Sequence, residues 1–431
     1  MLKQFDFGFG EQTVTFSVAE KQIVDVIEGK SVAAITDVRE AVQQVLRSPI
    51  GTAPLDQVIA AGDTVAVIVS DLTRAWVRHD LFLPPLFDEL NRAGVPDQDI
   101  KLVVALGAHR RNSDAENLAV YGEEVVRRVT IEQSCALDEE GFVPLGKTSR
   151  GVVVEINRHV AEADKVILTG GIVYHSMAGF SAGRKAVLPG VSSYASIQGN
   201  HSFCLHEVHG QGISPNSDSG ILYTNPMHLD QMEITAILNP AFLLNAVFTP
   251  DGGFACFVAG HWRDAWLEGC KTVQEIYGVP ITRQADITVA SSGGFPKDIN
   301  FYQASKGIEN AYGATRPGGI IIGVMECRDI YDPPDFSQWF DYVSLYDREM
   351  ALRQGFTVPG FVALKMGIVA KTVTVIMVTL EKNKEFFAKA GILTAATIDE
   401  AFALASEKLG TDSPSITIMP HAATTVPILK R

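Results

Sequence analysis

Short apolar runs that alternate with helical patterns are the feature that most limits how this chain can fold. Residues 64–69 (TVAVIV), 101–105 (KLVVA) and 165–169 (KVILT) are predicted strands, and segments 83–93 and 114–121 have the spacing of amphipathic helices. Strands that alternate with helices pair into parallel sheets that the helices cover. The pattern therefore predicts an α/β protein.

A break at residues 278–280 (GVP) divides this pattern into two parts. Helical spacing over 261–277 stops there, and the next predicted strand is at 287–290. We therefore expect two α/β domains with an active-site cleft between them. The expected domains are a cofactor-binding domain over 1–277 and a second domain over 278–431, whose last residues are candidates to pack back on the first.

Composition excludes several classes of function. The chain has 36 Lys+Arg against 50 Asp+Glu, a net charge of −14, whereas a nucleic-acid binder needs a basic face. Apolar runs such as 373–380 fall short of the roughly 18 residues of a membrane span, and the N-terminus lacks a signal-peptide core. Five scattered cysteines fit a reducing cytoplasm and exclude a disulfide scaffold. We expect a cytoplasmic protein that binds neither nucleic acid nor membrane.

Charged and glycine-rich segments follow the predicted strands directly. SDLTR (70–74) follows the first strand, LGAHR (106–110) the second, and the segment 170–185 the third. Because the carboxyl ends of parallel strands lie on one rim, where ligands bind, we expect these side chains to converge. The set comprises Asp71, Arg74, His109, Arg110, His175 and Lys185.

Two histidines of this set suggest acid–base chemistry. Histidine titrates near neutrality, so His109 and His175 in one pocket could act as acid and base on opposite faces of a substrate. The alternative is that each ring only satisfies a loop hydrogen bond. Gly179 and Gly183 could let backbone N–H groups approach a phosphate, although turn and packing glycines explain them equally well.

Three further groups carry chemical hypotheses. Lys185 beside Arg184 would have a lowered pKa if desolvated and become a nucleophile; otherwise it is a surface lysine. His201, Cys204, His206 and His209 include good metal ligands, but their spacing matches no standard zinc module. Tyr302 and Lys306 share a helix face beside Gln303, where Lys306 and Arg74 could hold a carboxylate; otherwise Lys306 is solvated.

These motifs together resemble the nickel-dependent lactate racemase family. The resemblance rests on SDLTR (70–74), GAHR (107–110), GGIVYHSMAGFSAGRKAVLPG (170–190), Asn200-His201 and GGFPKDINFYQASKG (293–307). Asn225-Pro-Met-His228 and Glu326-Cys327 add to it. Several motifs in the same order, from about residue 60 to 330, make the resemblance specific.

The resemblance implies two α/β domains and a nickel pincer nucleotide, a nickel pyridinium-3,5-bisthiocarboxylic acid mononucleotide made by other enzymes and tethered covalently at Lys185. It implies inversion of C2 of a 2-hydroxy acid, lactate or a related acid, by hydride transfer to and from this group. His201 would ligate the nickel, and His109 and His175 would be the acid and base. Asp71, Thr73, Gly179 and Gly183 would bind the cofactor, and Arg74, Tyr302, Gln303 and Lys306 the substrate.

One departure and two alternatives stay open. Ala75-Trp76 follows Arg74 where relatives have a proline-containing turn, so Trp76 could reshape the substrate pocket. A zinc enzyme built on His201, Cys204, His206 and His209 is one alternative. A non-catalytic protein that binds a hydroxy acid or the cofactor is the other.

Overall fold

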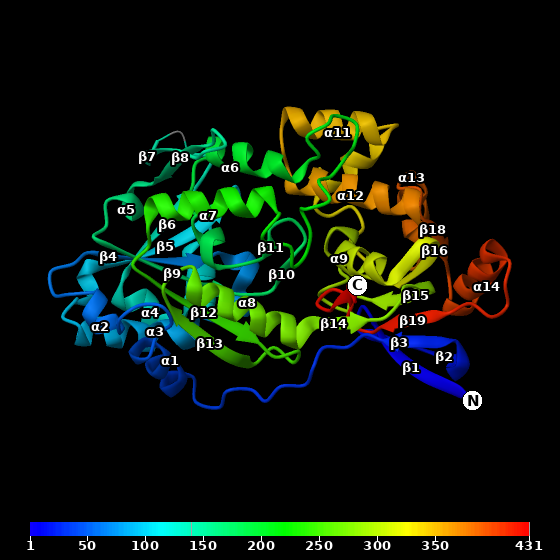
Figure 1. Ribbon diagram of the computed structural model, residues 1–431, viewed down its shortest axis with the longest axis horizontal. Coiled ribbons are helices and arrows are strands. Elements are labelled where there is room, and N and C mark those ends of the chain that lie inside the picture. Colours follow the sequence, from blue (N-terminus) through cyan, green and yellow to red (C-terminus); the bar gives the residue numbers. More distant parts are fainter. Residues whose placement is uncertain (139, 431) are drawn as a thin grey trace. The chain divides into compact units, whose positions relative to one another are not determined.

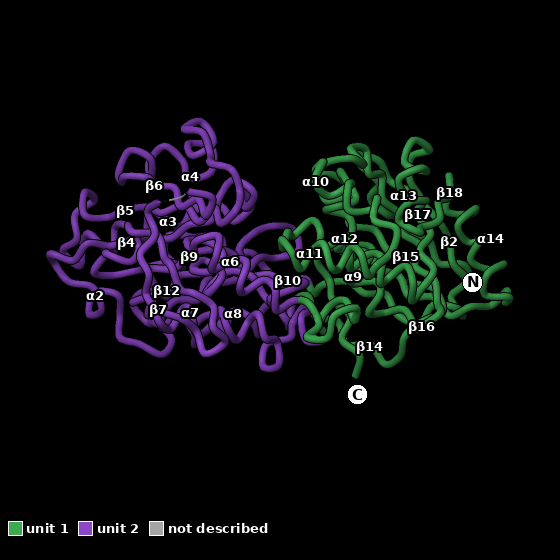
Figure 2. Tube along the Cα trace, turned by 90° about the horizontal axis from the view of Figure 1, so that it is seen from above, with its two compact units in different colours: residues 1–30, 205–215, 277–431 green, residues 31–204, 216–276 purple. Residues whose placement is uncertain are grey.

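The alternation of strands and helices builds two six-stranded sheets, each in its own structural unit. The computed structural model describes residues 1–138 and 140–430. Unit 1 contains residues 1–30, 205–215 and 277–431, and unit 2 contains residues 31–204 and 216–276 (Figure 2). Each unit has a mixed α/β architecture, so the predicted fold class of two α/β domains is confirmed.

The division of the chain differs from the expected one in two segments. Unit 2 ends at Ile276, beside the expected boundary, but residues 1–30 and 205–215 belong to unit 1. Residues 1–30 belong to unit 1 because β3 (Ile23–Val26) pairs in parallel with β19 (Ile416–Met419) at the edge of its sheet. At the end of the chain, β20 (Val426–Leu429) pairs with β14 (Gly278–Ile281), and this pair lies inside unit 1.

The sheet of unit 2 has a switch point in its strand order. The order is β13 (Phe254–Gly260), β12 (Phe242–Phe248), β9 (Lys165–Gly171), β4 (Val65–Ser70), β5 (Ile100–Gly107) and β6 (Thr130–Cys135), and only the β12–β13 pair is antiparallel. From β4 the chain builds one half through β5 and β6, and from β9 it builds the other through β12. The loops after β4 and β9 therefore leave the sheet side by side, where doubly wound folds bind ligands.

Burial of both faces explains why these strands read as continuous apolar runs. Val65, Val67 and Val69 of β4 pack into a core with side chains of α1 (Val38–Arg47), α3 (His79–Arg92) and α4 (Asp114–Arg128). The intervening Ala66 and Ile68 are equally buried on the opposite face. A capping box between Ser113 and Glu116 starts α4 at the expected position.

The other elements of unit 2 are short except for two helices. They are α2 (Leu55–Val58), β7 (Phe142–Lys147), β8 (Val153–Asn157), α5 (Arg158–Ala161), β10 (Tyr174–His175), β11 (Gly179–Phe180), α6 (Tyr194–His201), α7 (Pro226–Leu238) and α8 (Asp264–Tyr277) (Figure 1). Short 3-10 turns at η2 (Leu72–Val77), η4 (Gly183–Ala186) and η5 (Ser202–Cys204) follow the strands and helices that carry the predicted site.

The sheet of unit 1 is parallel throughout. Its order is β18 (Leu393–Ala395), β17 (Thr374–Val378), β16 (Thr315–Val324), β15 (Ala285–Ser291), β19 and β3. The hairpin of β1 (Leu2–Phe9) and β2 (Gln12–Ala19) packs Phe7 and Phe16 into one core with α14 (Ile398–Leu409). The remaining helices are α9 (Phe301–Ala314), α10 (Pro334–Ser337), α11 (Leu345–Gln354), α12 (Val358–Thr372) and α13 (Lys384–Lys389). No helix in the described residues is long and apolar enough to cross a membrane.

A fully buried histidine in unit 2 makes stability depend on pH. His79 begins α3 with its ring against Phe82 and Tyr121, and neither ring nitrogen has a hydrogen-bond partner in the described part of the chain. Burial lowers its pKa to about 3. Below about pH 6.5, the ordinary pKa of histidine, the unfolded chain binds a proton at His79 that the folded chain does not bind. The free energy of unfolding therefore falls as the pH falls toward 3.

We therefore predict that His79→Phe makes the protein less sensitive to acid. Between pH 7 and pH 5 the wild type should lose about 2 kcal/mol more of its unfolding free energy than the variant. Urea unfolding at the two pH values, followed by tryptophan fluorescence, measures both losses. His209→Phe, which removes an exposed histidine, is the matched control, and equal losses in wild type and His79→Phe would contradict the prediction.

Candidate functional site

Most of the predicted site residues lie at one rim of the unit 2 sheet, after the carboxyl ends of β4, β5 and β9. Asp71 and Arg74 follow β4, His109 follows β5, and His175 and Lys185 follow β9. Arg110 is an exception to the expected convergence. Its guanidinium instead donates two hydrogen bonds, of 2.9 and 2.7 Å, to the Glu116 carboxylate at the start of α4.

Asp71 and His109 form a carboxylate–imidazole pair. His109 Nδ1 lies 2.5 Å from Asp71 Oδ2, while Asp71 Oδ1 accepts from the Thr73 hydroxyl at 2.6 Å and the Thr73 N–H at 3.2 Å. Burial opposes ionisation of Asp71, but the bonds from His109 and Thr73 and the charge of Arg74 outweigh it and lower its pKa. The ionised carboxylate therefore orients the His109 ring, which is 53% exposed.

Residues 174–185 fold into a small hairpin and a 3-10 turn. β10 pairs with β11, so His175 lies opposite Gly179. Gly183 has a φ of +53°, and a Cβ there would lie 2.5 Å from the Trp266 ring. Ala182 also has a positive φ, of +54°, a conformation that costs a residue with a side chain on the order of 1–3 kcal/mol. Gly183 is thus required for packing, and a cofactor contact at Gly179 or Gly183 remains a prediction.

Buried polar side chains from other elements hold this turn. Asn245, in the middle of the apolar strand β12, accepts from the Gly183 N–H at 3.1 Å. Trp266 Nε1 of α8 donates to the Ser181 carbonyl at 2.9 Å, and Asn225 at the start of α7 donates to the Met177 carbonyl at 2.8 Å. Asn245 and Trp266 are not among the residues predicted from the sequence. A polar residue inside the apolar run FLLNAVF was the available signal for Asn245.

Arg184 is buried at the centre of this turn. It donates to the Ala178 and Ala182 carbonyls and to His228 Nδ1, the last at 3.0 Å, and its guanidinium lies 4.0 Å from the centre of the Trp266 ring. No carboxylate pairs with it in the described residues. Burial lowers its pKa to about 9, which still leaves it charged at neutral pH.

His175 and Lys185 are in direct contact. Lys185 Nζ lies 2.8 Å from His175 Nε2, and His175 Nδ1 accepts hydrogen bonds of 3.2 Å from the N–H groups of Met177 and Ala178. Burial lowers the pKa of both groups well below the usual values, and the charges of Arg74 and Arg184 act in the same direction. The predicted desolvated lysine beside Arg184 thus matches the surroundings of Lys185 in the structure.

His201 ends helix α6 and is buried close to the same groups. Its Nδ1 lies 3.0 Å from the Ile197 carbonyl oxygen, so Nδ1–H donates and the lone pair of the ring is on Nε2. Burial and the charge of Lys185 lower its pKa to about 3, so the ring is neutral. The preceding Asn200 donates to Asp230 Oδ2 at 2.8 Å and fixes the end of this helix. An imidazole whose Nδ1–H is held by a backbone carbonyl can bind a metal through Nε2.

Arg74 and Trp76 lie on η2, directly after β4. The Arg74 side chain makes no hydrogen bond or ion pair with residues 1–138 or 140–430, yet its charge acts on Asp71, His175 and Lys185. The rim thus carries an unpaired positive charge suited to an anion. Trp76 is 43% exposed, and its ring packs edge-on against Phe248 with centroids 5.2 Å apart.

The predicted substrate residues of the second domain lie on α9 of unit 1. Asn300 caps this helix by accepting from the Gln303 N–H at 2.9 Å. Lys306 Nζ donates to Gln303 Oε1 at 2.7 Å, and the Tyr302 ring packs against Phe336 with centroids 5.4 Å apart. Residues Phe301–Ala314 are helical, so Tyr302 and Lys306, four residues apart, share one helix face as predicted.

The structure does not assemble the zinc site of the alternative hypothesis. Cys204 contacts the Met227 sulfur at 3.1 Å, whereas His206 Nδ1 accepts from the Val208 N–H in the segment that belongs to unit 1. Within the described ranges, no three or more His, Cys, Asp or Glu side chains come together as metal ligands. The proposed set of four zinc ligands is therefore not brought together.

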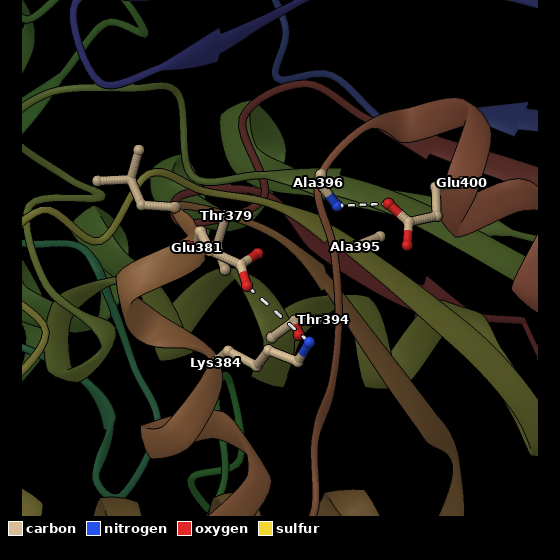
Figure 3. Close-up of a pocket in the computed structure, with 8 residues that line it drawn as sticks. Thr379, Glu381, Lys384, Thr394, Ala395, Ala396 and Glu400 are labelled. Atoms are coloured by element: carbon tan, nitrogen blue, oxygen red, sulfur yellow. Dashed lines mark hydrogen bonds and ion pairs between the residues drawn. The ribbon is translucent and has the colours of Figure 1, made fainter.

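A cavity of about 60 Å³ lies in unit 1, at the carboxyl ends of β17 and β18 (Figure 3). In the close-up Lys384 points toward Glu381, and Glu400 accepts from the Ala396 N–H at 2.8 Å. The lining of this cavity contains none of the predicted site residues. The volume holds a few water molecules and is too small for a nucleotide.

Comparisons with known proteins identify the relatives of this chain. Residues 9–212 match the family model of the lactate racemase N-terminal domain, and residues 281–426 match that of the C-terminal domain. The chain is 30% identical to the lactate racemase of Thermoanaerobacterium thermosaccharolyticum over 99% of both chains. It is 32% identical to that of Lactiplantibacillus plantarum over 75% of both.

Solved structures lead to the same group. The lactate racemase apoprotein of T. thermosaccharolyticum superposes with a TM-score of 0.89 at 29% identity, covering 99% of this chain and all of that one. A Thermotoga maritima protein shares the fold alone, with a TM-score of 0.62 at 17% identity. Two α/β units with histidines at a strand rim, matched over the whole chain to racemases, define an isomerase. The chain belongs to the lactate racemase family.

The close packing at Gly183 generates a testable prediction. Gly183→Ala should lower the unfolding free energy by at least about 2 kcal/mol more than Gly252→Ala, since both lose a positive-φ glycine but only the first overlaps a ring. Gly252 has a φ of +86°, and a Cβ added there would have no other atom within 4 Å. Urea unfolding of the two variants measures the difference. Equal losses of unfolding free energy would show that the Trp266 ring moves aside to accommodate the added methyl group.

Proposed function

We propose that this isomerase inverts C2 of a 2-hydroxy acid, lactate or a related acid, with His109 and His175 as acid and base. The observation that carries the proposal is the placement of both imidazoles at one rim with the unpaired Arg74 guanidinium. Membership of the lactate racemase family and the names of two relatives support lactate as the first substrate to test.

The residues at the rim fit the nickel pincer nucleotide that we propose as cofactor. The group is anionic, and the cations Arg74 and Arg184 make no ion pair with a carboxylate in the described residues, although Asp71 lies close enough to interact electrostatically with Arg74. Lys185 is a desolvated amine for the covalent tether, and the tautomer of His201 suits a bond to nickel. When bound, such a group would supply the hydride-transfer chemistry at C2.

The chain's own residues then handle protons and orientation. His109 Nδ1–H donates to Asp71, so His109 Nε2 carries the lone pair that takes the proton of a substrate hydroxyl. Burial disfavours the charged form of His175, and its Nε2 is the atom that would exchange a proton with the substrate once Lys185 carries the cofactor. Two histidines are needed because the mirror-image substrates present their hydroxyl groups on opposite sides. Arg74 would bind the carboxylate, and Tyr302, Gln303 and Lys306 are proposed to complete substrate binding.

Substitution of the two histidines tests this assignment. His109→Ala and His175→Ala should each lower kcat for racemisation by about 10²–10⁴-fold, the usual contribution of a general acid or base. Asp71→Asn should also lower kcat, because an amide in place of the carboxylate cannot hold the same tautomer of His109. His159→Ala, which removes a histidine outside the site, is the control. Unchanged kcat in either alanine variant would remove that residue from the mechanism.

The cofactor assignment is tested by intact mass and nickel analysis of protein produced together with the cofactor-making enzymes. We expect about one nickel per chain and added mass on the peptide that contains Lys185. Lys185→Ala should lose the added mass, and His201→Ala should keep it but bind less nickel. An unmodified mass without nickel, beside a loaded control racemase from the same cells, would overturn the assignment.

The same experiment separates the alternatives. Loss of metal on His206→Ala or His209→Ala would support the zinc enzyme, which the geometry does not favour. Full ligand affinity without turnover in the wild type would support a binding protein. We also propose a cytoplasmic location, which free thiols at all five cysteines support.

A further inference from the structure

The hydrogen bonds of His175 determine which of its nitrogens carries the proton. Nδ1 accepts from the N–H groups of Met177 and Ala178, so Nδ1 has a lone pair and no hydrogen. The hairpin of β10 and β11 fixes both donors relative to the ring. A neutral imidazole carries one hydrogen, which must therefore be on Nε2.

The position of that hydrogen determines the protonation state of Lys185. Lys185 Nζ lies 2.8 Å from His175 Nε2. An ammonium group has only hydrogens to offer and cannot accept from Nε2–H. The contact therefore requires a neutral amine whose lone pair accepts the imidazole hydrogen.

The charged and titratable neighbours of the pair favour the same state. Arg184 acts from the same turn, Arg74 from η2 and His201 from α6, while the Cys204 thiol on η5 is the one neighbour that opposes them. No carboxylate acts on Lys185 among these described neighbours. Burial disfavours a further charge beside two guanidinium groups, so geometry and electrostatics agree.

We propose that His175 has a role before catalysis: its Nε2–H holds Lys185 as a neutral, nucleophilic amine, and bond formation at Lys185 releases the histidine. When Nζ attacks an acyl carbon, the N–C bond forms, the leaving group departs with its electron pair, and a proton passes from Nζ to water. His175 cannot take that proton, because Nε2 already has one and Nδ1 is engaged. The resulting amide nitrogen delocalises its lone pair and no longer accepts from Nε2–H.

The chain contains a second lysine–histidine pair that serves as a control. Lys101 Nζ lies 3.1 Å from His159 Nδ1, and His159 Nε2 lies 3.6 Å from a Glu132 carboxylate oxygen. Because this pair has a carboxylate beside Nε2, we expect the imidazole hydrogen of His159 on Nε2 and Nδ1 accepting from Lys101. The two pairs thus share the same two residue types and are expected to differ in which partner donates.

Acetylation by acetic anhydride, quantified peptide by peptide by mass spectrometry, tests the proposal in the unloaded protein. Each lysine's rate is expressed as a fraction of its own limiting rate at high pH, which removes differences in access. At pH 7 this fraction should be at least about tenfold larger for Lys185 than for Lys101. Equal fractions for the two lysines would overturn the proposal.

Variants assign the effect to the imidazole. In His175→Gln the amide oxygen accepts from an ammonium group, so the fraction at Lys185 should fall toward that of Lys101. His159→Gln should leave Lys101 unchanged. A fraction at Lys185 that stays high in His175→Gln, with circular dichroism like that of the wild type, would assign the effect to burial alone and overturn the role of His175.

Nitrogen NMR of selectively ¹⁵N-histidine-labelled wild type keeps the proposal falsifiable if a variant fails to fold. We expect the Nε2–H tautomer of His175 at pH 7, with faster exchange of that hydrogen once Lys185 is acetylated. An Nδ1–H tautomer or an imidazolium would contradict it.

The release step rests on the proposed function, whereas the state of Lys185 does not. A reactive Lys185 that never gains a cofactor would contradict the proposed function only. A tethered cofactor on a protein whose free Lys185 shows the same acetylation fraction at pH 7 as Lys101 would contradict this inference only.

Discussion

A buried guanidinium holds together the segment on which the candidate site depends. Arg184 lies between the Trp266 ring and the carbonyls of Ala178 and Ala182, so it ties the two ends of the turn before Lys185. Those bonds stabilise a backbone in which Ala182 has a positive φ. Because nothing negative pairs with the guanidinium in the described residues, its charge also reaches the neighbouring lysine and histidines. One side chain thus sets both the shape and the potential of the site.

The local potential is opposite in sign to that of the whole chain. The net charge is −14, but the groups that act on Lys185 are two guanidinium cations and the Cys204 thiol, with no carboxylate among them. Four histidines that are buried or partly buried, at positions 79, 175, 201 and 228, have lowered pKa values for the same reason, the cost of removing charge from water. A rim with this potential therefore comes with a fold whose stability we expect to fall in acid.

Local sequence patterns predicted the strands and the loops that follow them, because apolar runs and the motifs at strand ends depend only on residues that are adjacent in sequence. His109, His175 and Lys185 came from that logic, and the structure places them at one rim. The patterns did not reveal Asn245 or Trp266, which reach the site from elements far along the chain. Nor did they show that β3 completes the unit 1 sheet, because pairing partners are chosen by tertiary packing.

The division of the chain also bears on how such proteins can recombine. Glu349 on α11 is buried and accepts from the N–H groups of Gly210 and Gly212, which lie in the segment contributed from the middle of unit 2. A fragment that spans only the C-terminal family match, residues 281–426, lacks that segment and the edge strand β3. The Glu349 carboxylate would keep its ion pair with Arg353 but lose its two backbone donors, and a sheet edge would be uncovered. Chimeras between relatives would therefore have to exchange the three separate stretches of unit 1 together.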